Sequence, residues 1–354
     1  MNLRQQVGQL ILAGVEGPQL TALERAWWKL IQPSGVILFR RNIEQSTQVV
    51  QLLRETAGLT QPLQFRCVDL EGGLVDRLRD LIAPMPSPAA VFAAGKSTNF
   101  VKHGRLIGRE VRALGFNTVF APVLDLALPA SAAVMRTRAV SPDPNGVIAY
   151  ASAFLDGLRA EHVSGCGKHF PGLGGGTLDS HEAMPLIERS RDELWQNDLA
   201  VFRALAGQLS MIMVAHASYP QIEGKTPASI SQFWIAEVLR KRIGFRRLVL
   251  SDDMEMGGVL TQTSIEEASV LAVAAGTDVI EVCKDPSLVL RAYEALLREA
   301  ERSAVFRRRV DAAARKVAAH KRKYLVADVF RIPTEQAMNK LRGNIQKFSQ
   351  EVTA

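Results

Sequence analysis

The segment of this sequence richest in chemically active groups is a glycine-rich stretch that ends in a carboxylate and an imidazole. It reads Lys168-His169-Phe170-Pro171-Gly172-Leu173-Gly174-Gly175-Gly176-Thr177-Leu178-Asp179-Ser180-His181. Four glycines within five positions let such a loop fold over a ligand at little steric cost. Loops that a rigid scaffold positions are where catalytic groups concentrate. Asp179 and His181 are therefore candidate catalytic groups, although an Asp-x-His sequence can also cap a helix.

Two adjacent acids follow an apolar run further along the chain, in Leu248-Val249-Leu250-Ser251-Asp252-Asp253-Met254. An ionised carboxylate at the end of a strand can attack an electrophilic carbon. The alternative is that Asp252 or Asp253 caps the next helix. Because the two acids are adjacent, one can face a site while the other caps the helix.

A similar arrangement occurs earlier, in Cys67-Val68-Asp69-Leu70-Glu71-Gly72-Gly73. Here the Asp69 carboxylate can accept hydrogen bonds from ligand hydroxyl groups. Lys168 and His169 supply donors of the kind that orient polyhydroxylated ligands. Arg77 and Arg138 are further candidate donors, and a surface ion pair is the commoner alternative for a single arginine.

The elements that must position these residues form an alternating pattern of short apolar runs and longer amphipathic stretches. The expected strands are Gly35–Phe39, Gln64–Leu70, Thr118–Pro122, Gly165–Phe170, Ser210–His216, Leu248–Asp252 and Val279–Cys283. The expected helices lie near residues 43–57, 98–115, 145–161, 190–207, 232–243, 264–275 and 286–302. Such alternation is typical of parallel strands buried on both faces. It fits two architectures, a (β/α)8 barrel and an open doubly wound sheet.

Polar residues at the strand ends favour the barrel. Different expected strands end at Asp69, Asp125, Lys168-His169, His216 and Asp252. In a barrel these ends converge on one mouth, where the active site is found. No G-x-G-x-x-G follows the first expected strand, so a dinucleotide-binding sheet loses its best support. We therefore expect an α/β protein, folded as a single-domain (β/α)8 TIM-type barrel.

The two ends of the chain are expected to be helical. Residues 2–31 have this pattern, with apolar contacts from Leu10, Ile11, Leu12 and Leu20. Ile332-Pro333-Thr334-Glu335 has the pattern of a helix start. We assign residues 1–325 to the barrel and residues 326–354 to a C-terminal helical appendage.

Composition restricts the class of protein further. The chain has 354 residues, of which 47% are hydrophobic, and barrels routinely fill this length as one domain. No apolar run reaches the roughly 18 residues of a membrane span, and the N-terminus lacks a signal-peptide pattern. A cytoplasmic location and no membrane partner are therefore expected.

Charge and cysteine usage exclude two other classes of protein. The formal net charge is +7, but the clusters at 307–309 and 321–323 fall in a helical stretch without any nucleic-acid-binding motif. We expect no nucleic-acid partner. Cys67, Cys166 and Cys283 are too few and too widely spaced for a disulfide framework or a zinc site, and are expected to be buried thiols.

At these motifs the chain resembles the β-N-acetylhexosaminidases of glycoside hydrolase family 3, of the NagZ type. The resemblance runs from about Gln9 to about Leu325 and touches successive expected strands. Its ordered motifs are Ser34–Phe39, Val68–Gly73, Phe120–Asp125, Lys168–Gly172, Asp179–His181, Pro227–Ser229, Ser251–Met254 and Ala275–Asp278.

The resemblance implies a barrel enzyme that removes terminal β-linked N-acetylglucosamine with retention of configuration, without a metal or other cofactor. Asp252 matches the nucleophile, and His181, with Asp179 as its partner, matches the acid/base. An imidazole titrates near neutral pH, and a neighbouring carboxylate stabilises its protonated form. The family's sugar-binding positions correspond to Asp69, Arg77, Arg138, Lys168 and His169. The implied substrates are carbohydrates with β-linked N-acetylglucosamine, among them the muropeptides on which intracellular members act.

Three leucines depart from the family pattern. Leu173 stands where the family commonly has the second His of Lys-His-Phe-Pro-Gly-His-Gly, and Leu70 and Leu74 stand where it often has Gln and Arg. The change at Leu173 removes a polar contact from the base of the loop and leaves the nucleophile and the acid/base pair intact. These departures concern substrate details more than catalysis.

Three other functions stay open at this point. A metal-dependent barrel hydrolase could use His169, His181, His216 and Asp252 as ligands, and a chelator would then abolish its activity. A phosphorylase of the same family would use phosphate to resolve the glycosyl-enzyme. A non-catalytic sugar-binding protein is the third, suggested by the three leucines. The sequence leaves the oligomeric state undetermined.

Overall fold

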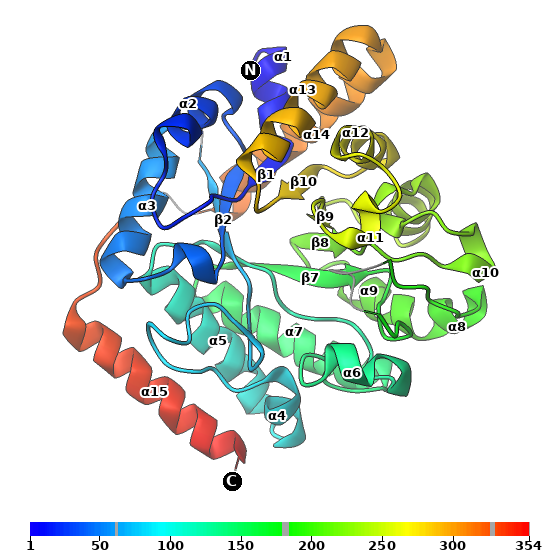
Figure 1. Cartoon of the computed structure of the whole chain (residues 1–354). Coiled ribbons are helices and arrows are strands. Elements are labelled where there is room, and N and C mark those ends of the chain that lie inside the picture. Colours follow the sequence, from blue (N-terminus) through cyan, green and yellow to red (C-terminus); the bar gives the residue numbers. More distant parts are fainter. Residues whose placement is uncertain (61–62, 179–183, 326–329, 354) are drawn as a thin grey trace.

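A closed barrel of eight parallel strands forms the centre of the protein. The computed structural model describes residues 1–60, 63–178, 184–325 and 330–353 (Figure 1). Around the barrel the strands follow in the order β1 (Ile11–Ala13), β2 (Gly35–Leu38), β3 (Phe65–Val68), β6 (Thr118–Val119), β7 (Ser164–Phe170), β8 (Met211–Val214), β9 (Leu248–Asp253) and β10 (Val279–Val282), which pairs again with β1. The (β/α)8 barrel expected from the sequence is confirmed.

The first strand was missed, because residues 2–31 were expected to be helical throughout. The structure has helix α1 (Leu3–Gly8), then β1, then helix α2 (Ala22–Ile31). Leu12 of β1 is in register with Gly35 of β2, while Ile11 is in register with Ile280 of β10. A strand of three residues buried on both faces has no visible two-residue period, so its sequence resembles a turn of apolar helix.

The helices on the outside of the barrel follow the expected order, as Figure 1 shows. The main ones are α3 (Ser46–Gly58), α5 (Ser97–Ala113), α7 (Pro144–Ala160), α8 (Arg191–Gln196), α9 (Asp198–Leu205), η4 (Phe233–Arg242), α12 (Ile265–Ala275), α13 (Pro286–Arg302) and α14 (Ala304–Tyr324). The helix expected at 190–207 is divided in two at Asn197. The segment expected at 232–243 is wound as a π-helix.

Shorter elements lie in the connections that follow the barrel strands. The hairpin of β4 (Leu70–Gly72) and β5 (Val75–Asp76) follows β3 directly. The short helices are η1 (Arg40–Asn42), α4 (Pro88–Ala93), η2 (Pro129–Ser131), α6 (Ala132–Met135), α10 (Pro220–Glu223), η3 (Ala228–Ile230) and α11 (Gly257–Leu260).

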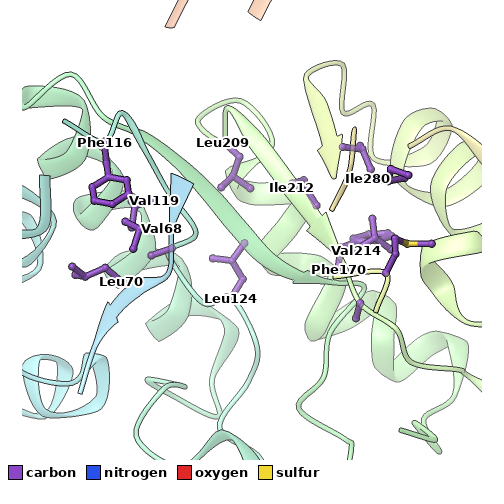
Figure 2. Packing of buried hydrophobic residues seen from close by; sticks show 14 of the residues in the cluster. Val68, Leu70, Phe116, Val119, Leu124, Phe170, Leu209, Ile212, Val214 and Ile280 are labelled. Carbon is purple, nitrogen blue, oxygen red and sulfur yellow. The ribbon is translucent and has the colours of Figure 1, made fainter. Parts of the chain in front are cut away.

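The core has two layers because each strand is buried on both faces. In β8, Met211 and Met213 belong to the cluster inside the barrel, whereas Ile212 and Val214 pack in the layer between strands and helices. Figure 2 shows part of this outer layer, where Val68, Val119 and Phe116 pack together. All three cysteines are buried free thiols, as expected.

The chain ends in helix α15 (Glu335–Thr353), drawn in red in Figure 1, which lies against α4 and α5. This helix begins where the sequence indicated a helix start, while the division into residues 1–325 and 326–354 stays a prediction. Its buried face includes Leu341, Ile345 and Phe348. Within the described part of the chain, no helix combines the length and apolar character needed to span a bilayer.

Candidate active site

A cavity of about 290 Å³ opens at the end of the barrel where the strands have their carboxyl termini. Its lining includes Phe39 after β2, Met213 of β8 and Glu281 of β10. The six sequence-predicted site residues that the structure describes all line it, namely Asp69, Arg77, Arg138, Lys168, His169 and Asp252. The other two, Asp179 and His181, lie outside the described residues.

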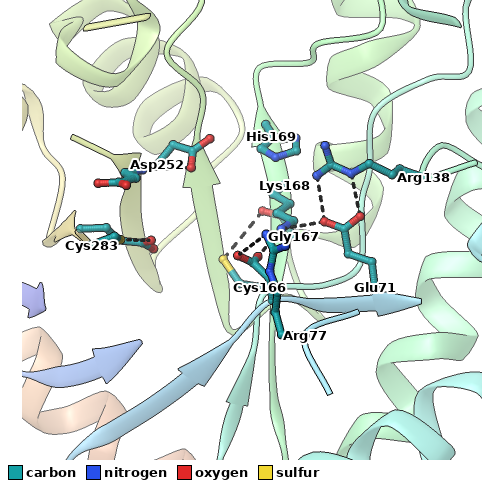
Figure 3. Close-up of polar contacts among 12 residues, drawn as sticks. Glu71, Arg77, Arg138, Cys166, Gly167, Lys168, His169, Asp252 and Cys283 are labelled. Atoms are coloured by element: carbon teal, nitrogen blue, oxygen red, sulfur yellow. Dashed lines mark hydrogen bonds and ion pairs between the residues drawn. The ribbon is translucent and has the colours of Figure 1, made fainter. Parts of the chain in front are cut away.

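One side of the cavity is built on a network of charges around Glu71. Arg138 donates from Nε and Nη2 to the two carboxylate oxygens of Glu71, at 2.8 Å each. Lys168 Nζ lies 2.8 Å from Glu71 Oε1 and also donates to Asp69 Oδ1 at 2.8 Å. Figure 3 shows Arg138 and Lys168 approaching the Glu71 carboxylate from different directions. Each donor is therefore held in one orientation at the cavity wall.

The protonation states of this network follow from its geometry. Burial alone would raise the pKa of Glu71, but the adjacent charges of Arg138 and Lys168 outweigh it and hold that pKa well below its usual range. For Lys168, burial would lower the pKa, and the carboxylates of Asp69 and Glu71 raise it instead. The lysine is thus a permanent cation, and Glu71 a permanent anion, at neutral pH.

Two glycines allow the hairpin β4–β5 to hold Glu71 in place. Gly72 has a φ of +96°, and a Cβ at this position would lie 2.2 Å from the carbonyl oxygen of Pro86. Beyond the turn, Arg77 Nη2 lies 4.0 Å from Asp69 Oδ2. Gly72 therefore allows a tight turn that a residue with a side chain could not make.

Asp125 fixes His169 and the beginning of the glycine-rich segment together. His169 Nδ1 lies 2.6 Å from Asp125 Oδ2, and the backbone N–H of Leu173 donates to Asp125 Oδ1 at 2.7 Å. The contact with Asp125 therefore sets the orientation of the His169 ring. The Leu173 side chain itself lines the cavity.

The pKa values of Asp252 and Asp253 are shifted in opposite directions although the two residues are adjacent on β9. Burial would raise the pKa of Asp252, but the nearby His169, His216 and Lys168 and the backbone N–H of Asp253 together lower it. The N–H of Asp253 donates to Asp252 Oδ1 at 2.9 Å. Burial raises the pKa of Asp253 to about 7. Both acids line the cavity, and Asp252 is the one that is more fully ionised at neutral pH.

His216 supports this strand end from β8. Its Nδ1 lies 2.7 Å from Ser229 Oγ, and its Nε2 lies 2.9 Å from the carbonyl oxygen of Asp253. Within the described residues no group of three or more His, Cys, Asp or Glu side chains is arranged to hold a metal ion.

Sequence reasoning missed Glu281, a buried acid of β10 that also lines the cavity. Its Oε2 accepts from the Cys283 thiol at 3.9 Å, and its Oε1 has no hydrogen-bond partner in the described part of the chain. Burial, followed by the negative charges of Asp252 and Asp69, raises the pKa of Glu281 well above its usual range. The available signal was an acid in the middle of the apolar run 279–283.

Two further residues of the site were visible in the sequence without being assigned to it. Glu71 lay inside the quoted motif before the glycine pair, and Asp125 was noted only as a strand-end acid. Both act through buried partners, Glu71 through Arg138 and Asp125 through His169. Such pairing becomes visible only when the barrel brings distant strands together.

Comparison with known proteins gives consistent matches along the chain. The model of the glycosyl hydrolase family 3 N terminal domain matches residues 2–319. A β-hexosaminidase of Pseudomonas aeruginosa is 38% identical over 292 residues, which cover 82% of this chain and 87% of the relative. A β-hexosaminidase of Neisseria meningitidis serogroup C is 35% identical over 290 residues, which cover 79% of each chain.

Solved structures agree with these matches. NagZ from Neisseria gonorrhoeae, in complex with N-trifluoroacetyl-D-glucosamine, aligns with a TM-score of 0.74 at 30% identity, covering 87% of this chain and 98% of that one. A glycoside hydrolase family 3 β-N-acetylglucosaminidase from Paenibacillus sp. aligns with a TM-score of 0.90 at 30% identity, covering 99% of this chain and 69% of that one.

Proposed function

Because the chain belongs to glycosyl hydrolase family 3, we propose that it is a retaining exo-β-N-acetylglucosaminidase with Asp252 as its nucleophile. The environment of Asp252 is the main support for this assignment. Its carboxylate lies at the cavity wall, and the nearby His169, His216 and Lys168 hold its pKa below the usual range. A carboxylate nucleophile must be ionised to attack, so this environment suits the role.

The reaction proceeds in two steps. In the first, an oxygen of Asp252 bonds to the anomeric carbon, the bond from that carbon to the leaving oxygen breaks, and His181 gives its proton to the leaving group. In the second, His181 takes a proton from water, the water oxygen bonds to the anomeric carbon, and the ester to Asp252 breaks. Two displacements at one carbon retain its configuration. Asp179 orients His181 and stabilises its charged form.

The sugar is held by polar groups that line the same cavity as Asp252. Asp69 accepts hydrogen bonds from sugar hydroxyl groups, while Lys168, His169, Arg77 and Arg138 donate to sugar oxygens. Support comes from the ion-pair network, because donors already fixed by Glu71 and Asp125 lose little freedom when a ligand binds. No metal or other cofactor takes part in either step.

We further infer that the natural substrates are peptidoglycan fragments and that the protein works in the cytoplasm. The net charge of +7 suits muropeptides, which carry carboxylates. The substrate and the location are proposed in addition to the type of bond that the protein cleaves.

A panel of aryl β-glycosides, with and without the N-acetyl group, tests the function together with muropeptide fragments. We expect turnover only of N-acetylglucosaminides, an unchanged rate with a chelator, and no dependence on added phosphate. A protein that binds these sugars without turning any of them over would be a sugar-binding protein instead. A rate that requires phosphate would identify a phosphorylase.

A further inference from the structure

A buried ion pair that is not part of the cavity lining lies beside two segments of the cavity wall. Arg189 Nη2 is 3.1 Å from Asp198 Oδ2, and the exposed fractions of the two side chains are 17% and 1%. Asp198 is the first residue of α9. Arg189 belongs to the segment 185–189, which the chain reaches after residues 179–183.

The glycine-rich segment 172–176 packs directly on this pair. A Cβ on Gly172, whose φ is +132°, would lie 2.7 Å from Asp198 Oδ1. A Cβ on Gly175 would lie 2.9 Å from Arg189 Cδ. Neither position has room for a side chain, so the backbone of the segment lies against both members of the pair.

The two segments beside the pair also form part of the cavity wall. Leu173 and Gly176 of the first segment line the cavity, as does Pro185 of the second. The second segment is fixed at one end, since the N–H of Ile187 donates to the carbonyl oxygen of Ser218 at 2.9 Å. The first is fixed at its start by Tyr219 Oη, which donates to the carbonyl oxygen of Gly172 at 2.8 Å.

Stability does not account for the presence of the pair. Arg189 Nε has no hydrogen-bond partner in the described part of the chain, and neither oxygen of Asp198 accepts a hydrogen bond from another described residue. A buried ion pair with few additional hydrogen bonds is often no more stable than neutral residues in its place. The pair therefore has a role other than stabilising the fold. Its position between segments 172–176 and 185–189 indicates that this role is to hold the two segments in place.

We propose that the Arg189–Asp198 ion pair is a positioning element for hydrolysis, which holds segments 172–176 and 185–189 at the spacing that forms the cavity wall. This inference rests on the proposed function, because the first segment leads along the chain to Asp179 and His181. The pair acts only while Asp198 is ionised.

The burial of Asp198 and the charges around it set the pH range in which the ion pair with Arg189 exists. Burial raises the pKa of Asp198 to about 6; Arg189 opposes this rise, and the negative charges of Asp125 and Glu193 add to it. The phenol of Tyr219 also packs nearby but stays neutral, because burial raises its pKa. The pair is thus formed above about pH 6 and lost below it.

Asp198→Asn tests the proposal, since it mimics the protonated acid at every pH. Amide hydrogen exchange of segments 171–178 and 185–189 is compared in the wild-type protein and the variant at the same pH. We expect faster exchange in the variant at about pH 7.5 and equal exchange at about pH 5, where the wild type has also lost the charge. The overall unfolding midpoint is expected not to fall.

Activity gives the second measurement. At about pH 7.5 we expect Asp198→Asn to lower kcat about tenfold with little change in KM, because a displaced wall misaligns bound substrate. The decline of wild-type kcat below about pH 6 should be absent in the variant. Arg189→Lys should retain more activity than Arg189→Gln. Asp192→Asn, which removes an exposed carboxylate from α8, should match the wild type in every measurement.

The experiments distinguish a failure of the positioning role from a failure of the proposed function. Equal exchange in wild type and Asp198→Asn at about pH 7.5, or an unchanged pH profile of kcat, would overturn the positioning role. A wild-type protein inactive on every β-N-acetylglucosaminide would overturn the proposed function, while the exchange comparison would still report on the wall segments.

Discussion

The Lys168 ammonium group lies 2.8 Å from Glu71 Oε1, and this contact joins the end of β7 to the hairpin β4–β5. The same carboxylate accepts hydrogen bonds from Nε and Nη2 of Arg138. Glu71 is therefore the anion on which two cations of the cavity wall depend. Without it, Lys168 and Arg138 would be buried positive charges, with Asp69 alone as a close partner of the lysine.

Glu71→Gln is expected to destabilise the protein by about 3–5 kcal/mol, the usual cost of leaving a buried charge without its partner. Urea unfolding at neutral pH measures this loss. Glu55→Gln is the matched control, because Glu55 pairs with Arg25 at the surface and its loss should cost less than about 1 kcal/mol. Equal losses for the two variants would mean that the Glu71 network contributes no more than a surface pair.

Asp252→Ala is expected to abolish nearly all turnover while the protein stays folded, because it removes the proposed nucleophile and, of the hydrogen bonds described above, only the one from the Asp253 N–H. In the wild type, a 2-fluoro sugar should trap the glycosyl-enzyme as an ester of Asp252. Peptide mapping by mass spectrometry locates the label. A label on Asp253 or Glu71 would refute the assignment of the nucleophile.

His181→Ala is expected to slow substrates with poor leaving groups far more than activated aryl glycosides, since only the former need a proton in the first step. Rates on a series of aryl N-acetylglucosaminides of graded leaving-group pKa test this. Asp252→Ala serves as the comparison, because it should slow all of them. A uniform loss in His181→Ala would assign the histidine to binding.

The sequence predicted the barrel and its mouth because both depend on local signals. Asp69, Lys168 and Asp252 are polar residues at the ends of apolar strands, and the closed sheet brings these ends together. The membership in glycosyl hydrolase family 3 is likewise confirmed. The roles assigned to individual residues stay predictions.

The sequence could not show features that arise only from packing between distant segments. Strand β1 is too short to display a period, and its strand character comes from pairing with β2 and β10. The ion pair between Arg189 and Asp198 joins two residues of ordinary local pattern, and its burial follows from the segment packed over it.

Lys321 at the opposite end of the barrel gives a prediction for stability against pH. Its side chain is 1% exposed, lies over the Phe65 ring and donates to Gln9 Oε1 at 2.7 Å. Burial lowers the pKa of Lys321 from 10.5 to about 7. Between these two values the unfolded chain binds the proton that the folded protein lacks, so this residue makes stability rise with pH.

The expected slope is up to about 1.4 kcal/mol per pH unit across that range. Lys321→Met should remove this slope and raise stability at neutral pH, which urea unfolding at several pH values measures. Lys323→Met, on the same helix but exposed, should leave the slope unchanged. If Lys321→Met unfolds at the wild-type midpoint throughout, the lysine is charged in the folded protein.

Of the three leucines that depart from the family pattern, Leu173 is the one that lines the cavity, and the structure shows how it is accommodated. Its backbone N–H is held by Asp125, and its side chain lies on the cavity wall. The anchor of the glycine-rich segment is therefore a backbone contact that survives a change of side chain. Leu173→His should leave the fold intact and change kcat/KM on N-acetylglucosaminides by less than about tenfold, with an increase expected from the added donor.

Leu173→His both removes the apolar side chain and adds a hydrogen-bond donor. Leu173→Ala separates these two effects, because it removes the apolar side chain without adding a donor. A gain in kcat/KM for His and a loss for Ala would assign the effect to the imidazole. If the wild type is inert on every β-N-acetylglucosaminide and Leu173→His alone restores turnover, the natural protein binds sugars without cleaving them. We expect the wild type to be active, because the backbone contact to Asp125 places the segment 172–176 without help from the residue 173 side chain.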